Sequence, residues 1–178
     1  MVAIYANSFL TINASASPES EGGRFVKRSS LASTTCKFRP SDSSGDIYVT
    51  EYIDEVPFSK SSQDHTGTRA WCLQEIVLPH RVVFYGRKMI GWLCDSKRIS
   101  QRDGEMGIAP GLRMENMQGK DLHLQRWAFI VMNYIARKLT YDREKLVAIY
   151  GLAAHIKVVL EDEYHAGIWR NDMIDGLL

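Results

Sequence analysis

The order of apolar and polar residues divides the chain into an α/β half and a helical half. Short runs rich in β-branched and aromatic residues predict three strands, at residues 9–14, 81–85 and 89–94. The last two are joined at Gly86-Arg87-Lys88, which predicts a β-hairpin, and the first suits a buried strand. Apolar residues at helical spacing predict a helix that opens near Trp71 and stops before Pro79, because proline cannot continue a helix. Residues 2–6 predict the last turns of a shorter helix.

A polar segment between residues 15 and 67 interrupts this pattern. It is rich in Ser, Thr, Asp and Gly, which favour turns and loops. Two stretches inside it predict strands, 46–53 by clear alternation and 35–39 less clearly. We therefore expect a long, partly ordered insertion within an α/β unit that spans residues 1–94.

After residue 94 the pattern becomes polar and then helical. Residues 95–121 contain several glycines and an Ala-Pro-Gly turn, which predict a surface loop. Residues 122–178 predict a helical C-terminal part, because apolar residues recur at helical spacing from His123 and again after Asp142. Asp142 is expected to cap the second of these helices, and residues 168–178 predict a third.

Composition and charge narrow the classes of partner. The 178 residues are 45% apolar and carry a net charge of +1, so no global charge attracts nucleic acid or anionic lipid. No apolar run approaches the roughly 20 residues that a membrane span needs. The three cysteines lack disulfide-framework or zinc-site spacing, which favours a reducing compartment, the cytosol or the nucleus, and no bound metal. We expect a cytoplasmic protein. We expect no nucleic-acid or membrane partner.

Glu75 is the first candidate for chemistry, because it is expected at a strand-to-helix junction, where α/β sheets place ligands. The plain alternative is a glutamate that interacts with the helix dipole and does nothing more. Trp71 precedes Glu75 by one turn and could stack on a planar base, although an aromatic on a helix is more often core. Cys72 with His80 or His65 as base is a weaker hypothesis than a small core cysteine.

Several blocks in order resemble the fungal heterokaryon-incompatibility (HET) domain over nearly the whole chain. M-V-A-I-Y-A-N-S-F-L-T-I-N-A-S-A-S is similar to the family's helix–strand block, and T-R-A-W-C-L-Q-E is similar to its R-G-W-T-x-Q-E block. R-V-V-F-Y-G and W-L-C follow as in the family, as do L-T-Y-D-R-E-K-L-V-A-I-Y-G-L-A and Y-H-A-G-I-W. The resemblance implies an intracellular protein of non-self recognition and programmed cell death.

The HET domain is in turn remotely similar to TIR domains, and W-C-L-Q-E-I followed by V-V-F-Y resembles the TIR segment W-C-x-x-E-L and its strand. This resemblance implies a partial TIR-like (flavodoxin-like) sheet with the segment 15–67 inserted. In TIR domains that cleave NAD, the glutamate of this segment is catalytic. The resemblance implies this catalytic role for Glu75 alone. Trp71 would be its neighbour and would contribute to ligand binding. NAD would be a substrate, and no cofactor is implied.

The family's A-L-S-Y-x-W-G and W-I-D-x-L-C-I blocks have no counterpart here, and the Trp-rich segment expected after residue 178 is also missing. The resemblance therefore implies a domain truncated at both ends, with impaired enzymatic activity. Uncovered apolar strand edges would then favour self-association or a protein partner. Two rival functions stay open: a non-catalytic interaction fragment, and a degenerate truncated paralogue.

Overall fold

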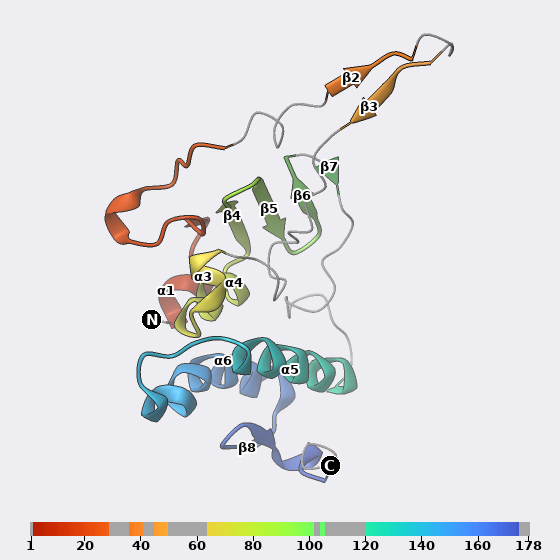
Figure 1. The fold of residues 1–178 in the computed structure, drawn as a ribbon. Helices are drawn as coiled ribbons and strands as arrows, with labels where there is room; N and C mark the ends of the chain where they lie inside the picture. The colour runs from red at the N-terminus through yellow and green to blue at the C-terminus, as the bar shows by residue number, and fades with distance from the viewer. Residues whose placement is uncertain are drawn as a thin grey trace.

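The computed structural model describes residues 2–28, 36–40, 45–49, 64–101, 104–105 and 120–174. They form an α/β sheet followed by a helical C-terminal part, as the sequence predicts. Three layers are stacked: the sheet, the short helices α1, α3 and α4, and the pair α5–α6 (Figure 1). The short helices thus lie between the sheet and the long helices.

The main sheet has five strands in the order β1-β4-β5-β6-β7: Thr11–Asn13, Arg81–Tyr85, Ile90–Cys94, Arg98–Ser100 and Gly104–Glu105. β1 runs parallel to β4, and every other neighbouring pair is antiparallel. The predicted β4–β5 hairpin is confirmed. A parallel pair needs a crossover connection, and here the connection includes α4, so this unit alone has the parallel arrangement of flavodoxin-like sheets.

The strand predicted over 9–14 is shorter than expected and lies at an edge of the sheet. Only Thr11–Asn13 pairs, and the expected burial is wrong: Phe9 is 81% exposed and Ile12 is 55% exposed. Hydrophobicity predicts a strand but not its place in the sheet. β1 is covered on one side by β4 and, among the described residues, by no strand on the other.

The two faces of the sheet differ because side chains alternate along each strand. Val82, Phe84 and Leu93 point towards the short helices and are buried together with Ile76 of α4. The row Ile12, Val83, Trp92 and Ile99 runs across the opposite side of four neighbouring strands. We call this second side the open face, since Ile12 and Ile99 remain exposed on it.

The larger core lies between the short helices and the C-terminal pair. The short helices are α1 (Val2–Ala6), α3 (His65–Thr68) and α4 (Gln74–Val77); the long ones are α5 (Lys120–Ile135) and α6 (Lys145–Leu160). Apolar residues of α5 and α6 recur at helical spacing and are buried against Leu73 and Val77. Among them, Ile130, Leu152, Ala153 and Ile156 are at most 1% exposed. The sequence pattern predicts both helices; the first is predicted from His123, and α5 begins three residues earlier, at Lys120.

The described residues of the predicted insertion include a 3-10 turn (Ser20–Gly22) and a hairpin of β2 (Cys36–Phe38) and β3 (Ile47–Val49). These strands fall on the predicted stretches 35–39 and 46–53, although residues 50–63 lie outside the described part. The hairpin extends away from the main sheet (Figure 1), and all six of its strand residues are exposed.

Two predictions after residue 94 are wrong. The expected loop 95–121 contains β6 and β7. The apolar pattern does not mark β6, because its one apolar residue, Ile99, is exposed and its buried residue is Ser100. Residues 106–119 lie outside the described part. Asp142 does not cap α6: it belongs to a 3-10 turn, Asp142–Glu144, and Glu144 precedes the helix without a side-chain cap.

The helix predicted over 168–178 is also wrong. Residues here form a small hairpin, β8 (Tyr164–His165) and β9 (Ile168–Trp169), followed by a 3-10 turn at Arg170–Asp172. Ala166 and Gly167 both have positive φ, 48° and 116°, so the chain reverses between the two strands. The reversal places Trp169 at 0% exposure against Trp127, with ring centroids 5.5 Å apart. Residues 175–178 lie outside the described part.

Candidate functional site

The segment that carries Glu75 is a short helical stretch packed beneath the sheet. A 3-10 turn, Trp71–Leu73, continues directly into α4, because Leu73 and Gln74 both have right-handed helical dihedral angles. Leu78 ends α4 before Pro79, as predicted. Cys72, Leu73 and Ile76 are buried, which fixes the stretch against its neighbours and leaves Glu75 half-buried.

Burial decides the electrostatic state of Glu75. It raises the pKa of this carboxyl group above its ordinary value of 4.5, against the opposing effects of a hydrogen bond with Tyr5 and the positive charge of Arg69. Burial also raises the pKa of the Tyr5 phenol, and the nearby negative charge of Glu75 raises it further. The Glu75 carboxylate is therefore poorly hydrated and is held by a phenol from α1.

Cys72, Arg69 and Arg137 interact electrostatically with one another or with Glu75, and we call these residues, together with Tyr5, the Glu75 group. Burial, reinforced by the charge of Glu75, raises the pKa of Cys72 to about 11, and Arg69 and Arg137 act in the opposite sense. Burial also lowers the pKa of Arg137 to about 10. The Arg137 Nη1 donates to the carbonyl oxygens of Thr66 (3.2 Å) and Arg69 (3.4 Å), which joins the end of α5 to the loop before Glu75. Cys72 is thus a neutral core thiol at neutral pH, which disfavours it as a nucleophile.

Trp71 lies one turn before Glu75, as the spacing predicts. Its indole Nε1 donates to Glu144 Oε2 at 3.1 Å, and the half-buried ring packs against the core formed by α5 and α6. The side chain that the resemblance assigns to binding therefore joins α4 to the turn before α6. Its remaining exposed surface is the part that a ligand could contact.

Sequence reasoning missed Tyr5, Arg69 and Arg137. Arg69 lies six residues before Glu75, so its proximity to a short helix could have been found from the sequence. Tyr5 is far away in the chain and reaches Glu75 because α1 packs on α4. Arg137 follows α5 and approaches because Ala70 N–H donates to the Lys138 carbonyl at 2.9 Å.

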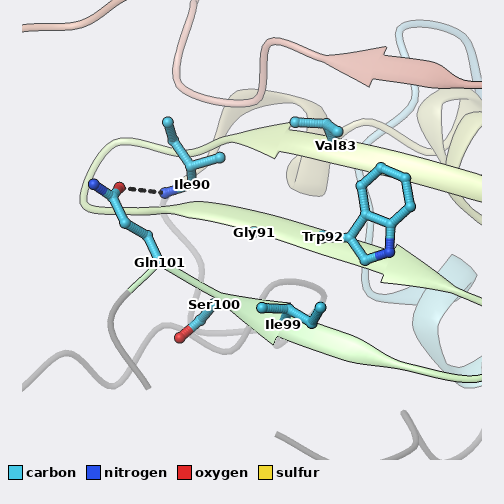
Figure 2. A pocket seen from close by; sticks show the side chains of 7 residues that line it. All are labelled: Val83, Ile90, Gly91, Trp92, Ile99, Ser100 and Gln101. Atoms are coloured by element: carbon cyan, nitrogen blue, oxygen red, sulfur yellow. Dashed lines mark hydrogen bonds between the residues drawn. The ribbon is translucent and has the colours of Figure 1, made fainter. Parts of the chain in front are cut away.

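A separate hollow of about 410 Å³ lies on the open face of the sheet (Figure 2). It is lined by Val83, Trp92 and Ile99 with their neighbours in β5 and β6. Glu75 belongs to the helix that packs on the other side of this sheet, next to Val82 and Leu93. The hollow and the Glu75 group are therefore two distinct features.

Within the described ranges, no cluster of His, Cys, Asp and Glu side chains has the geometry of a metal site. None of the helices described is both long and apolar enough to cross a lipid bilayer. Comparison of the chain with models of protein families, with the sequences of characterised proteins and with solved structures finds no significant match in any of the three.

Proposed function

We propose that this chain is a HET-domain protein of fungal non-self recognition and programmed cell death, and that it hydrolyses NAD with Glu75 as the catalytic carboxylate. One observation carries the enzymatic part: a desolvated glutamate on a helix between two parallel strands, held by the Tyr5 phenol. The W-C-L-Q-E-I segment supplies the link to this chemistry.

The proposed reaction is the hydrolysis of the bond between nicotinamide and ribose. Nicotinamide leaves with the electron pair of that bond, and water adds to the ribose carbon and releases a proton. Positive charge develops on the ribose during departure, as in glycoside hydrolysis. A carboxylate with little hydration stabilises such charge more strongly than one in bulk water, because the local dielectric constant is lower.

The test measures release of nicotinamide from NAD by chromatography. We expect release by the wild type and a loss of at least about 100-fold in Glu75→Gln, the scale of removing one charge-stabilising group. Glu163→Gln is the matched control, because Glu163 is 60% exposed and lies in the C-terminal hairpin region. No release by the wild type, or equal release by Glu75→Gln, would refute the enzymatic proposal.

The second candidate function is a non-catalytic interaction fragment, favoured by the edge of β1, which no described strand covers. Phe9 is 81% exposed and Ile12 is 55% exposed, and the edge carries neither lysine nor proline to block pairing. Light scattering should then show an oligomer that Ile12→Lys dissociates. Val158→Lys, at a 79% exposed position on α6, should leave it intact. A monomer at every concentration would contradict self-association.

A further inference from the structure

The open face of the sheet carries an apolar row that no described helix covers. The strand register places Val83 opposite Trp92, and Trp92 opposite Ile99, so three neighbouring strands contribute one side chain each. Ile99 is 37% exposed, and Val83 and Trp92 are half-buried. Neighbouring side chains in this row cover one another only in part, so apolar surface remains exposed to solvent.

The row borders a shallow hollow that is largely open to solvent. Its volume of about 410 Å³ lies within the roughly 300–1,000 Å³ of small-molecule sites. Its lining comes from three strands and the turn after β6: Val83, Ile90, Gly91, Trp92, Ile99, Ser100 and Gln101. Figure 2 shows the Trp92 indole and the side chains of Val83 and Ile99 along one end, and Gln101 at the other.

The chemistry of the lining restricts the ligand. Among the described residues, no charged side chain lines the hollow, so a charged ligand would gain no ion pair from them in return for its lost hydration. The indole of Trp92 makes a hydrogen bond with the Cys94 side chain, which restrains the orientation of the ring at the side of the hollow. Gln101 Oε1 accepts the Ile90 N–H at 3.4 Å, and the NH₂ group of the same amide has no partner among the described residues.

We propose that this hollow binds a neutral, flat aromatic molecule of about naphthalene size, which contacts the Trp92 indole and accepts a hydrogen bond from the Gln101 amide. Aromatic faces contact well in offset or edge arrangements, and Trp92 is the aromatic residue among the described lining residues. The site is independent of Glu75, because α4 packs on the other side of the sheet.

The first test uses prodan, a neutral naphthalene dye with one ketone, whose emission shifts to the blue in apolar surroundings. We expect saturable one-to-one binding with energy transfer from tryptophan. Ile99→Lys should weaken it at least about tenfold, the scale of a lost contact in an apolar site. Val158→Lys places the same charge at a 79% exposed position on α6 and should bind as the wild type does.

Two further variants separate ligand contact from loss of structure. Ile99→Thr keeps a β-branched residue in β6, so weaker binding by a variant with an unchanged unfolding transition reports the contact itself. Gln101→Leu should weaken prodan but leave the parent dimethylaminonaphthalene, which lacks the ketone, unaffected.

Three outcomes would overturn the proposal. The first is an absence of saturable prodan binding by the folded wild type. The second is equal weakening by Ile99→Lys and Val158→Lys. The third is a dimer that Ile99→Lys converts to a monomer and that prodan does not disrupt, because the open face would then be a protein interface.

Discussion

Gly151 of α6 lies where three helices meet, and replacing it with alanine tests how α1 is seated. An added Cβ would lie 2.6 Å from Val2 Cγ2 on α1 and 3.1 Å from Gln74 Nε2 next to Glu75. Gln74 Nε2 donates to the Ala148 carbonyl at 2.5 Å, so this side chain has little room to yield. The Val2 side chain must therefore change its rotamer, or α1 must shift.

The expected magnitude follows from two opposing effects. Extra volume in a packed contact costs about 1–3 kcal/mol, whereas Gly→Ala inside a helix gains about 0.8–1 kcal/mol. Gly151→Ala should thus lower the free energy of unfolding by about 0–2 kcal/mol. In the Val2→Ala background the clashing methyl group is gone and only the 3.1 Å contact with Gln74 Nε2 opposes the helical gain, so Gly151→Ala should cost less there than in the wild type.

Urea unfolding of the four proteins in this cycle measures the coupling between the two sites. We expect a coupling of about 1–2 kcal/mol, within the range found for residues in contact. Ile4→Ala replaces Val2→Ala in the control cycle, because Ile4 is 72% exposed on the same short helix. That cycle should be additive. Coupling below about 0.3 kcal/mol between Gly151 and Val2 would refute the described seating of α1 and, with it, the contact between Tyr5 and Glu75.

The remaining predictions concern titration and packing. Burial raises the pKa of Glu75, so the folded state binds this proton more tightly than the unfolded chain; its favourable effect on stability is present below pH 4.5 and is lost as pH rises through the folded pKa. Glu75→Gln should accordingly be more stable than the wild type at pH 7 and lose that advantage at low pH in thermal unfolding; an advantage that grows in acid would contradict this sign. Burial raises the pKa of Cys94, but hydrogen bonds from the side chains of Ser96 and Trp92 and from the Ser96 and Lys97 amides outweigh it and lower the pKa to about 7. Alkylation of Cys94, followed by mass spectrometry, should therefore have a midpoint near pH 7, and Cys72 should react only on unfolding; equal native rates would refute it. Leu93→Ala, at a position with 0% exposure, should cost about 2–5 kcal/mol in urea unfolding, against at most about 0.5 kcal/mol for Leu146→Ala at 55% exposure.

Local pattern predicts those elements whose hydrophobic residues alone determine them. α5 and α6 follow from apolar spacing, and the hairpin of β4 and β5 follows from two β-rich runs around a glycine. Pro79 ends the helical stretch for a covalent reason that no tertiary contact can override. The pattern failed at residues 168–178, because helical spacing of apolar residues competes there with an Ala-Gly reversal.

The candidate site shows the same division. The sequence places Glu75 on a short helix, with Trp71 one turn before it, because both positions depend only on local spacing. It does not reveal that Tyr5 approaches Glu75 when α1 packs on α4, or that Arg137, which follows α5, reaches the carbonyl oxygen of Arg69. Desolvation of the carboxylate is likewise a property of those contacts.

The sequence by itself determined the α/β class, the main helices and the one glutamate with a proposed role. Tertiary structure decided which strand lies at the edge, which side chains surround Glu75 and which face of the sheet carries a hollow. The physical reason is the range of the interactions. Helical and strand periodicities act between near neighbours, whereas burial, strand order and perturbed pKa values arise from contacts between residues far apart in the chain.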